Sequence, residues 1–192
     1  PIQIIDEKMK LMMGAFFIVI FHTLFNFVLL VIMFNTLKLT SPNLSFIYLL
    51  SSAFSTLILA FGALFLLLPI PVGEAIIQSK DLDTTIFSSA INLFSRINSY
   101  LYQFGMILWG CGGLILCYLL QKERLVPVLF PIAGYFGYLI FIIGCILELS
   151  GMTFGIIFSV PGGLFEILLS IWLIINGYKI GNVYEYRQKL QI

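Results

Sequence analysis

The sequence predicts an all-α protein, a polytopic helical membrane bundle. Of its 192 residues, 60% are hydrophobic and only 10% are charged, and the mean hydropathy is +1.08. A soluble domain carries about a quarter of its residues as charged side chains, so this chain cannot cover a water-facing surface. Its apolar runs reach the roughly 20 residues that a helix needs to cross a bilayer. The short alternating segments of a membrane β-barrel do not occur in the sequence.

Five apolar runs are long enough to span a membrane as helices. They cover about residues 11–34, 44–70, 90–120, 126–148 and 155–178. We expect residues 1–192 to form a single transmembrane helical domain, with an external loop at 71–89 and a cytoplasmic juxtamembrane tail at 179–192. No polar stretch is long enough for a soluble domain.

The basic residues outside the spans predict the orientation. Three of them, Lys8, Lys10 and Lys80, fall on the side of residue 1. Six fall on the other side, namely Lys38, Lys122, Arg124, Lys179, Arg187 and Lys189. Because positive loops stay in the cytoplasm, we expect a cytoplasmic C-terminus and an external residue 1, in the cell (plasma) membrane. An external first residue requires a cleaved signal or a further spanning helix upstream, and we favour the helix.

Each predicted helix carries polar and small residues along one face, at helical spacing. In the last helix Glu166 shares this face with Gly162 and Ser170, and Leu164 and Ile171 lie on the opposite face. A carboxylate at the bilayer centre costs about 2.5–3.5 kcal/mol on insertion scales, so we expect Glu166 to face other helices. Several tyrosines, together with Trp109, are expected to form the aromatic belts at the membrane surfaces.

The polar faces predict two pairings. Depth along the spans places Glu166 and His22 near mid-membrane, so we expect Glu166 to pair with His22 or with Asn26. Arg96 and Glu148 lie toward the outer ends of their spans, and we expect them to form an outer ion pair. The candidate polar interior or ligand site comprises Glu166, His22, Asn26, Gln103 and Ser55.

These pairings have a structural and a functional interpretation. As buried polar clamps they would fix the order of the helices, and membrane hydrogen bonds of this kind contribute about 0.6 kcal/mol each. In the functional interpretation Glu166 titrates, and His22 relays a proton or grips a substrate. A contact to lipid or to a small ligand is a third alternative.

No recognisable motif points to a cofactor or to catalysis. Cys111, Cys117 and Cys145 fall inside predicted helices without CxxC spacing, and a single histidine does not make a metal site. Phosphate loops, dinucleotide fingerprints and HExxH motifs do not occur in the sequence. We therefore expect no metal, no cofactor and no enzymatic activity. The net charge of +1 gives no reason to expect nucleic acid as a partner.

Three stretches resemble a known family. They are NTLKLTSPNLSFIYLLSSAFSTLILAFGALFLLL (35–68), CYLLQKERLVPVLFPIAGYFGYLIFIIG (117–144) and PGGLFEILLSIWLIINGYK (161–179). With their arginine-leucine-valine-proline turn and their glutamate-containing last helix, they resemble the prokaryotic multi-pass membrane-protein family catalogued as domain of unknown function 4386. The resemblance covers about residues 35–179. It implies a membrane fold with a further hydrophobic helix upstream, and no known activity. Ser55 and Thr56 stand where the family pattern has a polar pair such as arginine-glutamate.

Three functions remain to be distinguished. The first is a non-catalytic accessory, sensor or scaffold subunit with buried polar clamps, whose partners are membrane lipid and either other membrane subunits or a second copy of the chain. The second is a carrier or permease for small solutes or lipids, with a midplane polar site around Glu166 and His22, although no inverted repeat is visible. The third is an intramembrane enzyme, for which no catalytic constellation is recognisable. A filled space around Glu166 favours the first function, and an open space favours the second.

Overall fold

The computed structural model describes residues 8–39, 41–78, 84–152 and 155–177, and within these ranges it is helical without any strand. The elements in chain order are α2 (Lys8–Phe16), the π-helix η1 (Phe17–Thr23), α3 (Leu24–Leu37), α4 (Pro42–Phe65), α5 (Pro69–Gln78), α6 (Thr84–Lys122), α7 (Leu129–Leu149) and α8 (Gly155–Asn176). The predicted fold class, an all-α bundle, is confirmed.

Five helical segments in the described part of the chain are long and apolar enough to cross a membrane. They are Lys10–Leu37, Pro42–Ala75, Ser88–Lys122, Leu129–Leu149 and Ile157–Asn176. Each corresponds to one predicted span, so the five apolar runs are confirmed as helices. The first of them is built from α2, η1 and α3 in succession.

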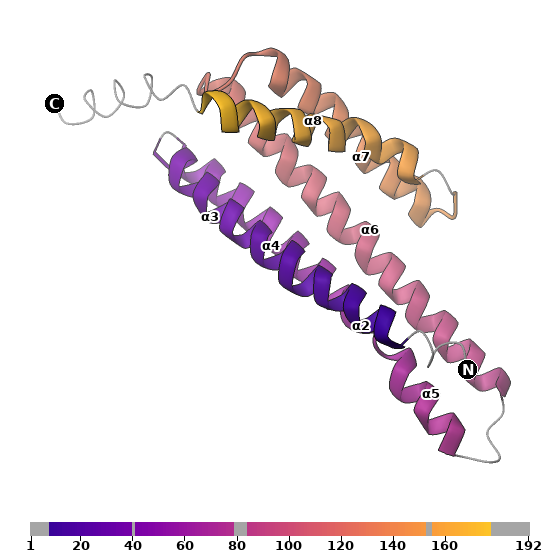
Figure 1. Cartoon of the computed structure of the whole chain (residues 1–192). Coiled ribbons are helices and arrows are strands. Elements are labelled where there is room, and N and C mark those ends of the chain that lie inside the picture. The colour runs from indigo at the N-terminus through magenta and orange to yellow at the C-terminus, as the bar shows by residue number, and fades with distance from the viewer. Residues whose placement is uncertain (1–7, 40, 79–83, 153–154, 178–192) are drawn as a thin grey trace.

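Helix α6 lies between two groups of helices (Figure 1). On one side it packs against α4, which in turn packs against α3, and on the other side it packs against α7 of the α7–α8 hairpin. Its 39 residues correspond to about 58 Å at 1.5 Å per residue. Because the hydrocarbon core is only about 30 Å thick, α6 is long enough to extend well past it.

Small residues bring α4 and α6 together. The hydroxyl of Ser55 donates a hydrogen bond of 2.6 Å to the carbonyl oxygen of Gly105, and the hydroxyl of Ser51 donates one of 3.0 Å to that of Leu108. A Cβ atom at Gly112 would lie 2.7 Å from Oγ of Ser52. Lipid offers no hydrophobic gain for such an association, so close packing and hydrogen bonds are what stabilise it.

Glycines likewise set the position of the α7–α8 hairpin. A Cβ atom at Gly113 of α6 would overlap the ring of Tyr138 of α7, so that ring lies directly over the α6 backbone. A Cβ atom at Gly137 of α7 would lie 3.0 Å from Cα of Gly162 of α8. These close approaches place Tyr138 of α7, and the turn of α8 that follows Gly162, in the middle of the bundle.

A polar contact ties the turn between α3 and α4 to the end of α6. The hydroxyl of Ser41 donates a hydrogen bond of 3.0 Å to Oε1 of Glu123 and accepts one of 2.8 Å from Nζ of Lys122. Ser41 itself is buried. The connection on the predicted cytoplasmic side is therefore held by charge-assisted hydrogen bonds.

The segment 71–89, expected to be a loop, is largely helical. Helix α5 continues to Gln78 and α6 begins at Thr84, while residues 79–83 lie outside the described ranges. Lys8 of α2 forms a 2.6 Å ion pair with Glu74 of α5 at this end of the molecule. The external location of this segment stays a prediction, and the predicted tail at 179–192 lies outside the described residues.

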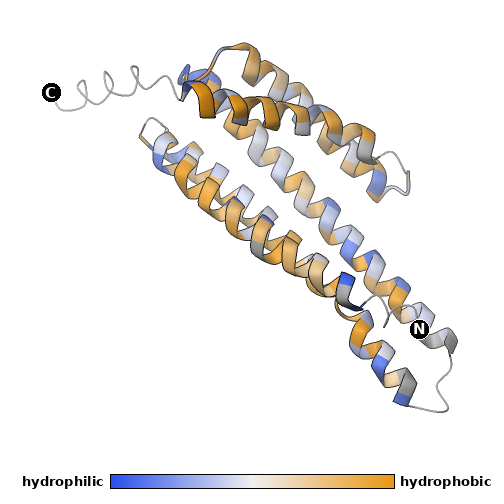
Figure 2. Ribbon diagram, in the orientation of Figure 1, coloured by the Kyte–Doolittle hydropathy of each residue, from blue (hydrophilic) through white to orange (hydrophobic). Residues whose placement is uncertain are grey.

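The polar face predicted for the third span divides into two parts. Figure 2 shows hydrophilic residues along the N-terminal half of α6, whereas α7 and α8 are largely hydrophobic. Asn92, Arg96 and Ser99 are exposed, whereas Gln103 and Gly113 are buried. The reason is that the α7–α8 hairpin covers only the C-terminal part of α6. The N-terminal part of the predicted polar face, with Asn92, Arg96 and Ser99, therefore has no helix of the hairpin opposite it.

Candidate functional site: a carboxylate held between three helices

Glu166 forms the polar centre of the site. It lies midway along the span Ile157–Asn176 and is half-buried. Its Oε1 atom accepts a hydrogen bond of 2.9 Å from the indole Nε1 of Trp109 and one of 2.8 Å from the hydroxyl of Tyr138. Since Trp109 belongs to α6 and Tyr138 to α7, this one oxygen atom links three helices. The prediction that Glu166 faces other helices agrees with this geometry.

The two donors hold the carboxylate in one orientation. Tyr138 is only 4% exposed, and its ring packs edge-on against Phe165, with the ring centroids 5.6 Å apart. Within the described residues both hydrogen bonds to the carboxylate go to Oε1. No buried side-chain nitrogen or oxygen atom of the described chain lacks a hydrogen-bond partner. The Oε2 atom is therefore not sealed in the protein interior, and it remains able to meet a further donor.

Two cavities meet at Glu166. The first, here termed the core cavity, has a volume of about 160 Å³ and is bounded by α3, α4, α6, α7 and α8. The second, the hairpin cavity, has a volume of about 260 Å³ and lies between α6 and the α7–α8 hairpin. Glu166, Trp109 and Tyr138 line both of them. The centre of the bundle is therefore not filled around the carboxylate.

The linings of these cavities contain aromatic and hydroxyl groups but no basic side chain. Tyr48, Ser52 and Ser170 line the core cavity, and Tyr102 and Ser159 line the hairpin cavity. None of the described residues that line either cavity is a lysine, an arginine or a histidine. Among the described residues, the Glu166 carboxylate therefore has hydrogen-bond donors but no cationic partner.

The predicted pairing of Glu166 with His22 is wrong. His22 lies in the π-helix η1, is exposed, and lines a different cavity with Tyr102 and Met106. Counting residues along an ideal α-helix overlooked this seven-residue π-helix, whose wider turn rotates the side chains that follow. Depth alone also could not reveal that His22 lines a cavity with residues of α4 and α6.

Asn26, the alternative partner, lies closer to the predicted position. It lines the core cavity together with Glu166, although no hydrogen bond joins the two residues within the described chain. Trp109 and Tyr138, and not Asn26, donate the hydrogen bonds to Glu166. The structure thus brings Asn26 and Glu166 to one cavity without pairing them.

The predicted outer ion pair between Arg96 and Glu148 is also wrong. Glu148 instead accepts a hydrogen bond through Oε2 from Nε2 of Gln103, while Arg96 is exposed. Arg96 lies seven residues before Gln103 on α6, which is about 10 Å along the helix axis. Because α7 ends at Leu149, Glu148 reaches α6 at the level of Gln103 and not at that of Arg96.

Gln103 and Ser55, the remaining candidates, are both buried but do not belong to the Glu166 site. Gln103 binds Glu148, and Ser55 binds the carbonyl oxygen of Gly105. Neither residue lines the core cavity or the hairpin cavity. Both therefore act as contacts between helices, Gln103 between α6 and α7, and Ser55 between α4 and α6.

The sequence pattern does not predict Trp109 as a partner of Glu166. Trp109 was assigned to an aromatic belt, but it lies in the middle of the bundle, as does the buried Tyr48. Tyr138 could have been found, because it follows Gly134 and Gly137 on the small-residue face of its helix. For Trp109 the sequence holds no comparable signal, because only the packing of α6 against α8 reveals its partner.

Within the ranges that the structure describes, no group of three or more histidine, cysteine, aspartate or glutamate residues lies close enough to hold a metal ion. The three cysteines are free thiols, Cys111 exposed and Cys117 and Cys145 buried. The polar chemistry at Glu166 is thus that of one carboxylate, two fixed donors and surrounding aromatic rings.

Comparisons with known proteins identify the family. Neither the curated proteins nor the solved structures contain a match to this chain. The family described as Domain of unknown function (DUF4386) matches residues 2–177. This match includes the first span, so it extends further toward the N-terminus than the resemblance seen over residues 35–179. The protein therefore belongs to the family described as Domain of unknown function (DUF4386).

Proposed function

We propose that this protein is a non-catalytic membrane protein that binds a small organic cation at Glu166, as a sensor or carrier. One observation supports this proposal above all others. The Glu166 carboxylate is oriented by two donors on Oε1 and lies between two cavities that have no basic side chain in their described linings. An ionisable group inside a membrane domain is a candidate functional site by default.

Charge decides which class of ligand fits the site. An ionised carboxylate in an apolar interior is costly unless a counter-charge accompanies it. Trp109 and Tyr138 supply hydrogen bonds but no positive charge. An ammonium group near Oε2 would supply that charge, whereas an anionic ligand would be repelled.

The walls of the cavities fit the same class of ligand. Trp109, Tyr138, Tyr48 and Tyr102 surround the carboxylate on both sides. Aromatic faces attract cations, and aromatic residues recur where proteins recognise quaternary ammonium groups. With about 160 and 260 Å³, each cavity is smaller than the roughly 300–1,000 Å³ of a drug-sized site. The ligand is accordingly expected to be small.

A second candidate function is that of a scaffold subunit with polar clamps. It is favoured by the fact that the two hydrogen bonds of Glu166 come from two different helices, and that Gln103 and Glu148 form another contact between helices. In this interpretation the partners are membrane lipid and other subunits or a second copy of the chain. The clamp explains why Oε1 is bonded, but it does not explain the two cavities.

Binding of choline tests the first proposal. The Trp172→Phe variant leaves Trp109 as the only tryptophan, so its fluorescence reports on the site in protein purified in dodecyl maltoside. We expect choline to change this fluorescence saturably. Its uncharged isostere 3,3-dimethyl-1-butanol should bind at least about tenfold more weakly, which corresponds to about 1.4 kcal/mol.

Two glutamine substitutions complete the test. Glu166→Gln should weaken choline binding at least about tenfold, whereas Glu148→Gln, the matched control at another carboxylate of the bundle, should leave it unchanged. The proposal is overturned if choline does not bind saturably, if the uncharged isostere binds equally well, or if Glu166→Gln binds like the parent. Each of these results would favour the scaffold.

A further inference from the structure

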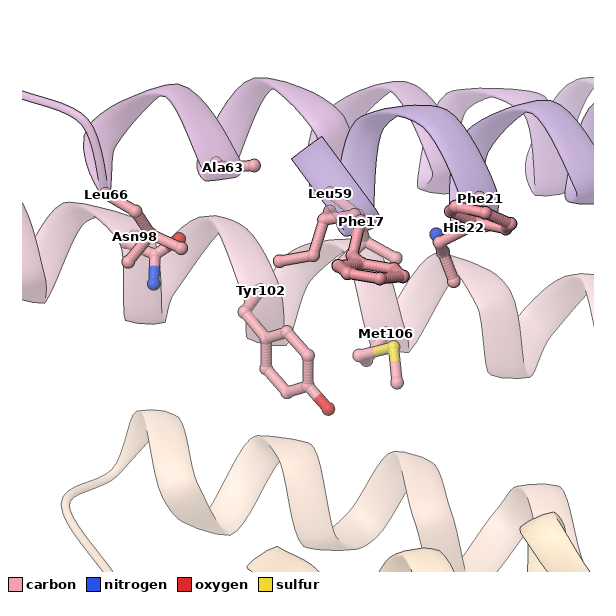
Figure 3. Close-up of a pocket in the computed structure, with 11 residues that line it drawn as sticks. Phe17, Phe21, His22, Leu59, Ala63, Leu66, Asn98, Tyr102 and Met106 are labelled. Carbon is pink, nitrogen blue, oxygen red and sulfur yellow. The ribbon is translucent and has the colours of Figure 1, made fainter. Parts of the chain in front are cut away.

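A third cavity, here termed the lateral cavity, lies between η1, α4 and α6 (Figure 3). Its volume is about 490 Å³, which is larger than either cavity at Glu166. Apolar side chains from all three helices form most of its wall, with Phe17 from η1, Leu59 and Ala63 from α4, and Met106 from α6. A volume of this size is typical of ligand sites.

The local sequence explains why space is left here. Gly62 allows α4 to approach α6 so closely that a Cβ atom would lie 3.3 Å from Oδ1 of Asn98. The first span does not follow this approach, because it changes to a π-helix at Phe17–Thr23, in which the hydroxyl of Thr23 donates to the carbonyl oxygen of Ile18. Short π-helical segments within α-helices are frequent at functional sites. The result is a pocket between one widened helix and two tightly packed ones.

The lateral cavity runs along the direction of the spans. In Figure 3 Asn98 and His22 lie at opposite ends of the row of side chains, with Leu59 and Ala63 between them. Asn98 lies 24 residues before Lys122, the end of α6, which is about 36 Å along the axis. His22 lies 15 residues before Leu37, the end of α3, or about 22 Å. With Lys122 and Leu37 placed at the edge of a hydrocarbon core of about 30 Å, Asn98 reaches the headgroup layer on the opposite side and His22 lies within the hydrocarbon.

The side-chain amide of Asn98 has hydrogen-bonding capacity that the described residues do not use. Asn98 is half-buried, lines the cavity, and its side chain has no hydrogen-bond partner within the described chain. Its amide nitrogen carries two donors. The most favourable occupant is therefore a molecule with a hydrogen-bond acceptor at the membrane surface and a hydrocarbon body that extends inward past Ala63 and Leu59.

We propose that the lateral cavity binds the hydrocarbon chain of a fatty-acyl lipid, whose carbonyl oxygen accepts a hydrogen bond from the side-chain amide of Asn98. The bilayer supplies such chains at the depth of the cavity, and the exposed rings of Phe17 and Phe21 form its lipid-facing rim. His22 closes the deep end without taking part in recognition of the head group. Glu166 does not line this cavity, although Tyr102 and Met106 belong to the walls of both this cavity and the hairpin cavity. The proposal does not depend on the function proposed for Glu166.

Quenching by a brominated lipid tests this proposal. Trp109 follows Met106 of the cavity wall by three residues on α6, so a chain in the cavity brings its middle near the indole ring. In the Trp172→Phe variant, reconstituted in nanodiscs of dioleoylphosphatidylglycerol, low mole fractions of 9,10-dibromostearic acid should quench Trp109 saturably. Unbrominated stearic acid should reverse the quenching by competition.

Five substitutions locate the site and distinguish it from the site at Glu166. Ala63→Phe fills the cavity and should reduce the saturable quenching at least about threefold, whereas Ala133→Phe, the same change on an exposed face of α7, should not. Asn98→Leu should weaken the apparent affinity at least about fivefold, and His22→Leu should leave it unchanged. The proposal is overturned by quenching that never saturates, by equal quenching in Ala63→Phe, or by dependence on His22 in place of Asn98. Glu166→Gln should have no effect, which separates this site from the cation site.

Discussion

The indole nitrogen of Trp109 on α6 lies 2.9 Å from Oε1 of Glu166 on α8, across the middle of the bundle. The hydroxyl of Tyr138 on α7 reaches the same oxygen atom at 2.8 Å. A single carboxylate thus joins three helices, two of which are not neighbours in the sequence. The contact accounts for the position of an acidic residue in an apolar helix, and it leaves the second oxygen atom without a hydrogen bond from the described residues.

Loss of either donor should destabilise the bundle modestly. We expect Trp109→Phe and Tyr138→Phe each to lower the free energy of unfolding through the lost hydrogen bond by about 0.6 kcal/mol, and by at most about 1.7 kcal/mol. Unfolding by sodium dodecyl sulfate in mixed micelles measures this change. In a double-mutant cycle Tyr138→Phe should cost less when Glu166 is already leucine, which has no acceptor for the hydroxyl. Strict additivity of the two changes would show that the hydrogen bond contributes nothing.

Gly113 should not tolerate a methyl group. Its Cβ atom would overlap the buried ring of Tyr138, so we expect Gly113→Ala to lower stability by about 1–3 kcal/mol, as overpacking in a core does. Gly163 is the matched control, since a Cβ atom there meets nothing within 4 Å. Gly163→Ala should leave the unfolding midpoint unchanged or slightly raised, because alanine is the better helix former. Equal effects of the two substitutions would contradict this packing of α7 on α6.

The partner of Glu148 can be tested against the alternative that the sequence favoured. Gln103→Leu removes the donor of the observed contact and should lower stability by about 0.6–1.7 kcal/mol. Arg96→Gln should change it by less than about 0.5 kcal/mol, as is usual for an exposed residue away from such contacts. Unfolding in mixed micelles distinguishes the two results. A larger loss of stability in Arg96→Gln than in Gln103→Leu would instead support the ion pair between Arg96 and Glu148.

The ion pair between Lys8 and Glu74 should contribute little. Its nitrogen and oxygen atoms lie 2.6 Å apart, but the side chains are 41% and 48% exposed. Pairs exposed to this extent are screened by water and salt, so Glu74→Gln should cost less than about 1 kcal/mol. The cost should shrink further when the salt concentration rises from 0.01 M to 1 M. A large, salt-independent loss would place this pair in an apolar environment.

The five spans could be predicted because bilayer thickness sets the length of an apolar run, and each run carries its small residues on one helical face. The buried Gly134, Gly137 and Tyr138 of α7 follow that rule. The ends were less predictable, since the helical continuation through α5 to Gln78 and the start of α6 at Thr84 include polar residues. The apolar pattern alone therefore does not determine where these helices begin and end.

The partners of the polar groups could not be predicted from depth. Counting residues assumes straight α-helices perpendicular to the membrane, whereas the first span contains a π-helix around His22 and α6 extends well beyond the α7–α8 hairpin. Glu166 was correctly predicted to face the interior, but its partners were sought among histidine and asparagine. Tryptophan and tyrosine were assigned to the membrane surface, where their amphipathic rings are common, although the same rings donate hydrogen bonds inside a bundle.

The orientation of α8 tests the central claim most directly. Single cysteines placed along residues 160–174, in a variant without Cys111, Cys117 and Cys145, can carry a nitroxide label whose collisions with dissolved oxygen report contact with lipid. Phe165 and Leu169 are 3% and 7% exposed, whereas Ile167 and Ile174 are 60% and 85% exposed. We predict minima of oxygen accessibility at positions 165, 166 and 169 and maxima at 167 and 174. A maximum at position 166 would mean that this carboxylate faces the acyl chains, and the site proposed around it would not exist.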